Sequence, residues 1–362
     1  MRIEVIERLL EFATSAPSGD NAQPWRFTFD PEERSLAIGI EESRVDSPKA
    51  MWRFIARLSV GAALENLIRA APCLGLDATL VEPRPGEAAR VALQRSPGSA
   101  VPPDELALLE RRTTNRKAYD GSAVPSGTAA RLRDSTPSRC GVSTHWILDR
   151  ARIEAMAELM FRMDATMYGV RAIWKSIEGR IRFDRPWDDE VGLGLSQGSL
   201  EQPRLKLWTI RNLGGLPHSW LRGIGLVSAF SRRTRALVRS ASGVCYLVSE
   251  DSRAEADVRA GRLLQRAWLA LAGEGYATHP MNTIALMEHV LAHGEPEIRS
   301  CVEATPMPRW IREFKALVPG AGERRSVFLM RFGRAPTPTI RNGRLPVPSV
   351  LSVCTGATSR RA

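Results

Sequence analysis

The densest group of residues that could do chemistry lies near the amino terminus, where residues 16–27 read APSGDNAQPWRF. Pro, Gly and Asn favour a tight backbone path at a helix end, and Gln and an aromatic residue follow at the start of a strand. Asn21 and Gln23 each present donors and acceptors, which suits the edge of a flat heterocycle that carries carbonyl groups and an N–H. A helix C-cap followed by a turn explains the same residues, so both interpretations stay open at this point.

A basic run follows at residues 111–120, which read RRTTNRKAYD. Guanidinium groups match phosphate oxygens in a bidentate way, and a threonine hydroxyl adds a hydrogen bond, so the run is a candidate anion cradle. A solvated helix end is the alternative interpretation of a lone basic run.

Two later segments carry further candidates. Residues 275–282, GYATHPMN, place a glycine, a turn and a proline after a helical pattern, and residues 341–346, RNGRLP, form a basic segment in the tail. His279 is a candidate acid or base, but a loop histidine is more often a surface or packing residue. His289 and His293 have the spacing of helical metal ligands but lack a convincing acidic or cysteine partner nearby, so no metal site is expected.

Residues 16–27 resemble the PSxxNxQPWxF signature of FMN-dependent nitroreductases, matched at every fixed position by Pro17, Ser18, Asn21, Gln23, Pro24, Trp25 and Phe27. The basic run is similar to the RRSxRxF element with which these proteins bind the FMN phosphate, ribityl chain and pyrimidine edge. It is slightly longer and has Thr in place of Ser. The GYATHPMN segment is similar to one whose backbone lies against the flavin, where an N–H faces flavin N5. The tail resembles a closing basic segment that clamps the phosphate.

The resemblance implies one bound FMN and a set of residues that hold it. The expected cofactor-binding residues are Pro17, Ser18, Asn21, Gln23, Arg111, Arg112, Thr113, Asn115, Arg116, Pro280, Met281, Arg341 and Arg344. Within this set, the residues expected at the phosphate and ribityl chain are Arg111, Arg112, Thr113, Arg341 and Arg344. Ser18, Asn21 and Gln23 are expected at the ring, with support of the loop as the alternative role of Gln23. No catalytic side chain is expected, because the flavin carries the difficult chemistry.

The distribution of these motifs indicates a fused pseudo-dimer. The amino-terminal half, residues 1–100, holds PSxxN, and the carboxy-terminal half, residues 104–362, holds the RRTTNR, GYATHPMN and closing arginine elements. A weak internal repeat relates the helical pattern of 61–76 to that of 261–276. This layout is similar to the Acg-like branch, single-chain FMN proteins of the nitroreductase fold. The expected fold is α+β, with two nitroreductase-like halves around antiparallel sheets flanked by helices.

Periodicity predicts the elements that position these motifs. The expected helices span 3–15, 51–71, 150–176 and 254–273, and the expected strands 25–29, 36–40, 244–249 and 326–332. Residues 184–225 show no sustained period and are rich in Gly, Pro and Trp. Loops of such length are usually functional, so we expect a lid in which Trp187, Trp208 and Trp220 cover the flavin.

Composition excludes several other classes of protein. The net charge is +11, but arginine is spread along the chain without a basic run interleaved with aromatics, so nucleic acid is not an expected partner. No apolar stretch approaches the roughly 20 residues of a membrane span. The five cysteines are scattered and odd in number, which argues against disulfides and zinc. A cytoplasmic protein is expected.

The resulting hypothesis is an FMN-binding oxidoreductase of the nitroreductase type. It transfers hydride through flavin N5 to an unknown acceptor, with NAD(P)H as the candidate donor. The alternative is a protein that binds or sequesters flavin under the lid and has no nicotinamide-dependent turnover. A monomer and a weak homodimer are both compatible with one fused chain.

Overall fold

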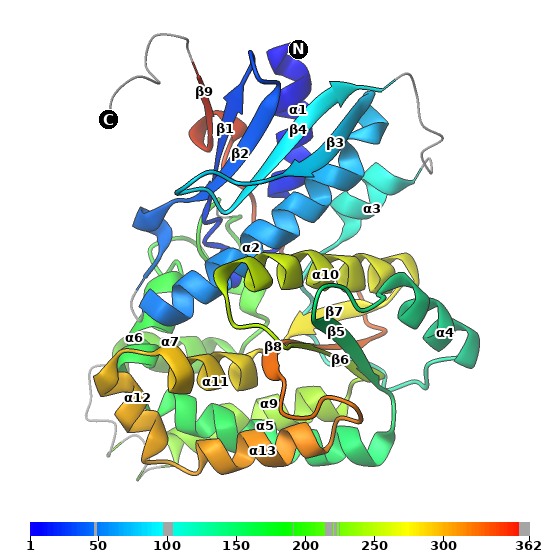
Figure 1. Ribbon diagram of the computed structural model, residues 1–362. Helices are drawn as coiled ribbons and strands as arrows, with labels where there is room; N and C mark the ends of the chain where they lie inside the picture. The colour runs from blue at the N-terminus through cyan, green and yellow to red at the C-terminus, as the bar shows by residue number, and fades with distance from the viewer. Residues whose placement is uncertain are drawn as a thin grey trace.

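Two β-sheets and the helices packed on them form the molecule (Figure 1). The structure is a computed structural model that describes residues 1–46, 49–96, 104–190, 192–213, 220, 223 and 225–354. Long helices alternate with short, mostly antiparallel strands, which confirms the expected α+β class.

The first sheet belongs mainly to the amino-terminal half. Its strands, in the order β3-β4-β2-β1-β9, are β1 (Trp25–Asp30), β2 (Ser35–Ile40), β3 (Leu76–Val81), β4 (Ala89–Arg95) and β9 (Leu351–Val353). Helices α1 (Ile3–Thr14) and α2 (Lys49–Ala70) pack together beneath it. All neighbouring strands are antiparallel except β1 and β9, so the tail returns to the amino-terminal half.

Alternation along β1 explains why it lies over this core. Trp25, Phe27 and Phe29 are buried, whereas Arg26 is exposed. Successive side chains of a strand point to opposite faces, so these aromatic residues all face α1 and α2. The expected strands 25–29 and 36–40 are confirmed, and they pair with each other in antiparallel fashion.

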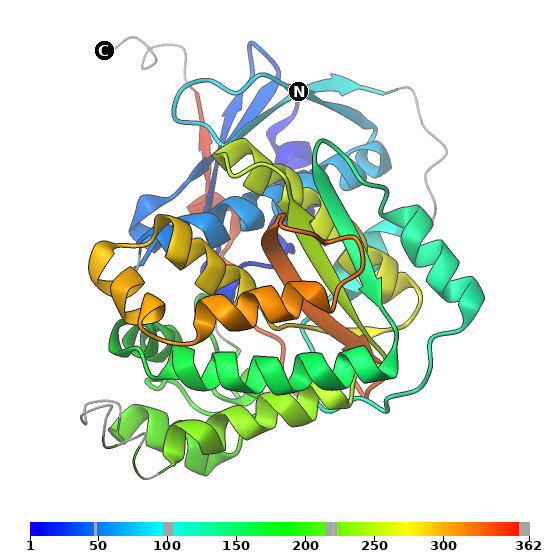
Figure 2. The same ribbon diagram turned by 60° about the horizontal axis from the view of Figure 1, so that its bottom comes forward.

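The second sheet has the antiparallel order β5-β6-β8-β7 and lies in the carboxy-terminal half. Its strands are β5 (Val142–Ile147), β6 (Gly243–Ser249), β7 (Ala277–Pro280) and β8 (Arg325–Gly333). The surrounding helices are α3 (Glu105–Arg111), α4 (Ser126–Ser135), α5 (Arg150–Tyr168), α6 (Arg171–Arg180), α7 (Arg204–Leu213), α9 (Leu226–Arg239), α10 (Ala254–Gly273), α11 (Thr283–His293), α12 (Pro296–Glu303) and α13 (Met307–Ala316). Figure 2 shows α5 and α9 side by side.

Two expectations about this half were wrong. The helix expected over 150–176 is interrupted, because Gly169 bonds back to Thr166 and Val170 is extended before α6 begins. The segment 184–225, expected to be irregular, contains α7, which begins directly after Pro203 and buries Leu207 and Ile210 on one face. Residues 214–219, 221, 222 and 224 lie outside the described part of the chain.

Helices α2 and α10 cross at a pair of glycines that occupy equivalent positions in the sequence repeat. A Cβ built on Gly61 would overlap the carbonyl oxygen of Val258 and lie 2.9 Å from Cα of Gly261. A Cβ on Gly261 would overlap the carbonyl oxygen of Leu58. Leu58 and Val258 are themselves equivalent, so each helix makes the same contact with the other.

Polar contacts at this crossing follow the same reciprocal pattern. Glu65 accepts hydrogen bonds from Arg266 at 2.6 and 3.1 Å, and Asn66 accepts one from Gln265 at 2.6 Å. Residue 65 is equivalent to 265 and residue 66 to 266. Such exchange of partners is the mark of an isologous, two-fold interface.

The ends of the two helices are also equivalent. Gly75 and Gly275 are both left-handed, with φ of 70° and 76°. The following N–H groups, of Leu76 and Tyr276, bond to the carbonyls of Ala71 and Leu271. Both are glycine-terminated helix ends in which a left-handed residue allows the chain to reverse. Together with the reciprocal crossing, they support the expected pseudo-dimer.

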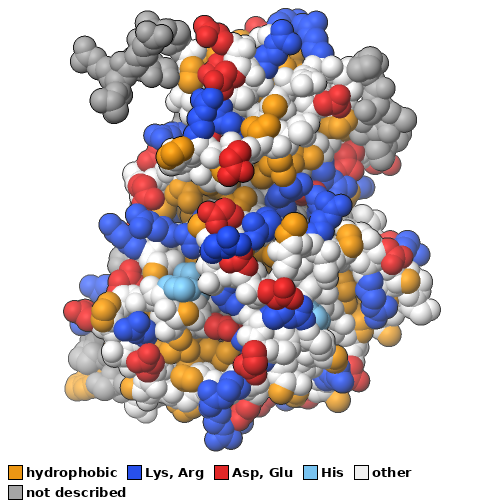
Figure 3. Space-filling view, viewed as in Figure 1, with side chains coloured by type: hydrophobic (Ala, Val, Ile, Leu, Met, Phe, Trp, Pro, Cys, Tyr) orange, Lys and Arg blue, Asp and Glu red, His pale blue; other side chains and the backbone are white. Residues whose placement is uncertain are grey.

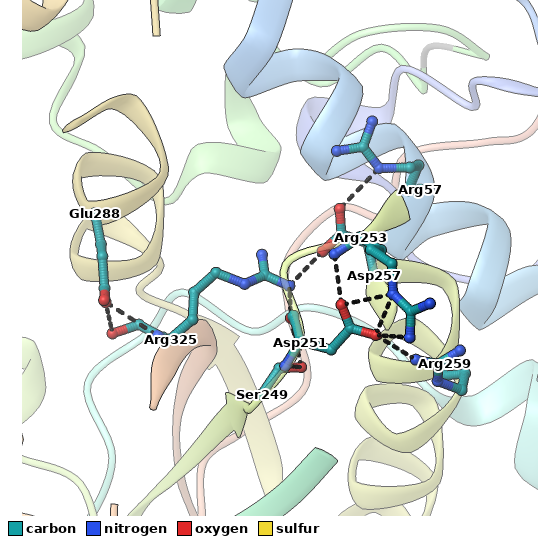
Figure 4. A network of polar contacts seen from close by, with 9 residues as sticks. Arg57, Ser249, Asp251, Arg253, Asp257, Arg259, Glu288 and Arg325 are labelled. Atoms are coloured by element: carbon teal, nitrogen blue, oxygen red, sulfur yellow. Dashed lines mark hydrogen bonds and ion pairs between the residues drawn. The ribbon is translucent and has the colours of Figure 1, made fainter. Parts of the chain in front are cut away.

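A charged network joins the two helices to the second sheet (Figure 4). Asp257 is fully buried and accepts hydrogen bonds from Arg57 of α2 at 2.7 Å and Arg325 of β8 at 2.6 Å. Asp251, at the start of the same network, pairs with Arg253 and Arg259. A buried carboxylate that keeps both partners fixes the position of α10 against β8, because separating the charges would leave one buried and uncompensated.

Charge on the surface is mixed. On the face in Figure 3, Asp and Glu side chains are interspersed with Lys and Arg, which lie across the middle of the molecule as well as at its ends. Across the described residues, no helix combines the length and apolar character that crossing a bilayer requires.

Candidate functional site

A cavity of about 660 Å³ lies where the sequence motifs meet. Its walls come from the turn after α1, from α2, from the basic run after α3, from α5, from α9 and α10, from the end of β7 and from the tail. Segments from both ends of the chain therefore enclose one volume, within the range typical of small-molecule sites.

Most of the expected cofactor-binding residues line this cavity. They are Pro17, Ser18, Asn21, Arg112, Thr113, Arg116, Pro280, Met281, Arg341 and Arg344. Gln23, Arg111 and Asn115 do not line it. The motifs are thus brought together, but not every side chain faces inward.

The three other residues have different roles. Gln23 is fully buried, donates to the Gly192 carbonyl and accepts from the Leu345 N–H at 2.9 Å, so it joins the motif to the tail. Asn115 donates to the Pro336 carbonyl at 2.8 Å. Arg111 is exposed at the end of α3.

The turn after α1 is held in an unusual conformation. Asp20, Asn21 and Gln23 all have positive φ, of 46°, 55° and 47°. Non-glycine residues adopt this region at a cost of about 1–3 kcal/mol each, and such strain persists only where surrounding contacts enforce it. Gly19 allows the turn to approach α2, because a Cβ there would overlap the side chain of Ile55.

Arg112 is the main unsatisfied group in the cavity. Its side chain is only 5% exposed, stacks over the Trp268 ring at 4.8 Å, and donates from Nη2 to the Ser15 carbonyl at 3.0 Å. Nε and Nη1 are buried and have no hydrogen-bond partner among the described residues. Burial, with the nearby Arg344 and Arg341, holds the pKa of Arg112 well below its usual range. A buried cation with free donors is costly unless an anion meets it.

The tail arginines are engaged with the backbone. Arg344 donates to the carbonyls of Thr14 at 2.8 Å and Ala16 at 3.0 Å, which are at the carboxyl end of α1, and to Asn21 Oδ1 at 3.0 Å. Arg341 donates to the Glu110 carbonyl at 2.8 Å at the end of α3. Cations at helix carboxyl ends satisfy otherwise unpaired carbonyls. Both side chains therefore line the cavity and also fasten the ends of α1 and α3 beside it.

His279 presents a neutral imidazole to the cavity. The fully buried Arg331 donates from Nε to His279 Nδ1 at 3.3 Å, so the proton of a neutral ring is on Nε2. Burial and the neighbours Arg331, Arg116 and Arg233 hold the pKa of His279 well below its usual range. The residue is a fixed hydrogen-bond donor rather than an acid or base at neutral pH.

One backbone N–H group of the next residues is already paired. The N–H of Met281 donates to the Leu329 carbonyl at 2.8 Å and is not available to a ligand. Asn282 and Thr283, at the amino terminus of α11, line the cavity beside it. The first N–H groups of a helix have no partner within the helix, so this end of α11 can meet an electronegative atom.

A second charged group lines the cavity around Asp164 of α5. This buried carboxylate accepts hydrogen bonds from the hydroxyls of Thr234 and Thr283, and burial raises its pKa. Lys206 of α7 lies close enough to interact with it, and burial lowers the pKa of Lys206 to about 8. Sequence reasoning missed these residues, because isolated charges on helices carry no motif.

The chain is similar in sequence to curated proteins of Mycobacterium tuberculosis. The chain is 26% identical over 354 residues to an uncharacterized protein of Mycobacterium tuberculosis, covering 92% of this chain and 46% of the relative. Over 217 residues it is 30% identical to a putative NAD(P)H nitroreductase of the same species, covering 54% of this chain and 62% of the relative. The chain is therefore similar in sequence to a putative nitroreductase over part of its length. It spans between 46% and 62% of the length of these curated relatives.

Solved nitroreductases resemble the chain in part. One is an FMN-dependent nitroreductase from Mycobacterium smegmatis in complex with NADPH, at 16% identity and a TM-score of 0.36 over 70% of this chain and 96% of that one. Another is a nitroreductase with bound FMN from Desulfitobacterium hafniense, at 12% identity and a TM-score of 0.39 over 69% of this chain and 97% of that one. No family model matches the chain.

In this nitroreductase-like chain the expected lid lies partly at the cavity. Glu190, Leu195, Ser199, Leu200, Gln202 and Lys206 line it. The three tryptophans do not. Trp208 and Trp220 are exposed, at 56% and 69%, and Trp187 packs instead under Arg204. The aromatic cover expected from the sequence is therefore wrong, because Trp208 and Trp220 are exposed and Trp187 packs in a cluster with Trp174 and Leu207.

Proposed function

We propose that the chain is an FMN-binding oxidoreductase of the nitroreductase type. The observation that carries the proposal is the pair of unpartnered N–H groups on buried Arg112, inside a cavity built from the signature turn and the basic run. A phosphate group supplies the oxygens and the negative charge that this side chain lacks. The relatedness to a putative NAD(P)H nitroreductase supports the same conclusion.

The residues present fit such a cofactor. Arg112 and Thr113 would bind the phosphate, while Arg341 and Arg344 hold the ends of α3 and α1 around it. Ser18 and the backbone around Asn21 line the same cavity, as do Pro280 and Met281. We also propose that residues 190–206 close this cavity as part of a lid.

The chain's own contribution to the reaction is electrostatic. FMN, when bound, supplies the hydride-accepting and hydride-donating chemistry. Arg116 and His279 line a desolvated cavity, where fixed donors stabilise negative charge far better than they do in water. No side chain is required to act as a base, which agrees with the lowered pKa of His279, because a low pKa makes a weak base.

NADPH should reduce the flavin of the purified protein. NADPH is the proposed donor because a related protein carries an NAD(P)H nitroreductase name. Mixing the FMN-loaded protein with NADPH in the absence of oxygen should abolish the visible absorbance of oxidised flavin. The control is dithionite, which reduces any accessible flavin. Absorbance that survives both NADPH and NADH but is lost with dithionite would contradict the oxidoreductase and indicate a flavin-binding protein without nicotinamide turnover.

A further inference from the structure

Cationic side chains on two helices line the cavity in addition to those of the basic run and the tail. They are Lys206 of α7 and Arg233 of α9, which line it together with Asp164 of α5. Arg112, by contrast, follows α3, and Arg341 and Arg344 belong to the tail. The cavity therefore has cationic donors on elements that the cofactor motifs do not include.

The acidic residue in this group is already satisfied. Each oxygen of Asp164 accepts a threonine hydroxyl, from Thr234 and Thr283. Arg233 donates from Nη2 to the Glu201 carbonyl, but its Nε is buried without a partner among the described residues. A buried donor of this kind is costly unless a ligand supplies an acceptor.

The local charge favours an anion. Burial raises the pKa of Asp164 and of Asp20. Arg116 and Arg233 remain cationic, since guanidinium groups stay protonated in proteins. Among the described residues that line the cavity, six are Arg or Lys and four are Asp or Glu, so basic side chains are in excess.

An apolar wall stands beside these donors. Met167 and Tyr168 follow Asp164 by one helical turn on α5, so they share its face. Ile173 and Ile177 of α6 line the cavity next to them, again one turn apart. A cationic end and an apolar wall together match a ligand with a charged head and a small hydrocarbon body.

We propose that Lys206 and Arg233 bind the carboxylate of a compact organic acid, whose hydrocarbon part packs on Met167 and Ile173. Its role as the electron acceptor rests on the proposed oxidoreductase function, whereas its binding does not. The subsite lies on α5, α6, α7 and α9, outside the signature motifs that predict the cofactor site.

The test uses benzoate as the probe and benzamide as its neutral counterpart. The full chain is first assayed for bound FMN, and binding of each probe is then measured by calorimetry. Benzoate should bind at least about ten-fold more tightly than benzamide, since each charge-assisted hydrogen bond contributes about that factor or more. Because calorimetry does not depend on turnover, a protein without FMN would refute the proposed function and still test the carboxylate subsite.

Variants assign the effect to the two side chains. Lys206→Met and Arg233→Met should each lower benzoate affinity about ten-fold or more, with benzamide affinity and FMN content unchanged. Lys206→Arg should retain benzoate binding. The matched control is Arg232→Met, because Arg232 is the exposed neighbour of Arg233.

The pH dependence is a further readout. Asp164 from α5 and Arg233 from α9 act on Lys206, whose pKa is about 8. Benzoate affinity should therefore fall as pH rises through about 8 and the ammonium loses its proton, and Lys206→Arg should remove this fall. Equal affinity for benzoate and benzamide overturns the proposal. So does a loss of FMN in Lys206→Met with benzoate binding intact, which would assign the side chain to the cofactor.

Discussion

Replacing Arg112 by Met should weaken FMN binding by about 1.5–3 kcal/mol, the contribution of a hydrogen bond to a charged group. At 1.4 kcal/mol per factor of ten, this is about a 10- to 150-fold rise in the dissociation constant. The reason is that Arg112 brings two buried, unpartnered N–H groups to the cavity. Equilibrium titration of the apoprotein with FMN measures the effect.

Arg111 provides the matched control for this measurement. It is the adjacent arginine of the same run, yet it is exposed and does not line the cavity. Arg111→Met should therefore leave FMN affinity nearly unchanged. Riboflavin, which lacks the phosphate, should bind the parent and Arg112→Met equally. An equal loss of FMN affinity in both variants would show that the run acts through its overall charge, and no loss in either would remove the phosphate from this position.

Stability offers an independent readout of Arg112. In the apoprotein its guanidinium is buried with donors unpaired, so replacement by Met should not lower the melting temperature and removes a desolvated charge. A variant that folds as stably as the parent but binds FMN weakly separates ligand binding from structural damage.

Gly61→Ala should destabilise the fold by about 3 kcal/mol, at the upper end of overpacking costs. Elsewhere in a helix the same change is favourable by up to about 1 kcal/mol. At Gly61 the new methyl group would overlap the Val258 carbonyl and approach the Gly261 backbone, which cannot move aside as a flexible side chain can. Thermal or urea unfolding measures the change.

Gly273→Ala is the control, since nothing lies within 4 Å of a Cβ at that position near the end of α10. It should be neutral or stabilising. Gly261→Ala should behave like Gly61→Ala, because the two glycines make equivalent contacts across the crossing. If Gly61→Ala and Gly273→Ala had the same effect, the close contact of α2 and α10 would not exist.

The sequence predicts the parts of the site that are written in short motifs. Pro17, Asn21 and Arg112 are recognisable because fixed spacing preserves their chemistry, and the structure brings them to one cavity. The repeat at Gly61 and Gly261 is visible for the same reason. The roles of the site residues are harder to predict. The sequence predicts Arg344 as a phosphate ligand, but in the structure its guanidinium donates hydrogen bonds to carbonyl groups at the end of α1.

Other features depend on tertiary contacts that no local pattern records. From the sequence, Lys206 and Arg233 are indistinguishable from charges on a solvated helix face. Burial in the folded chain lowers the pKa of Lys206, and this burial depends on tertiary packing. Strand β9 is too short to show alternation, and its parallel pairing with β1 joins residues from opposite ends of the chain. Exposure of Trp208 is equally a matter of packing, because a large aromatic residue predicts burial.

One cavity, assembled from the single signature turn and the single basic run, should bind one FMN. The most direct measurement is release of cofactor from the purified full chain with acid, followed by chromatographic identification and quantitation against protein concentration. We expect FMN at one equivalent per chain after saturation with the cofactor. Two equivalents would contradict the single site of the fused pseudo-dimer, and a chain that neither carries nor takes up FMN would contradict the proposed function itself.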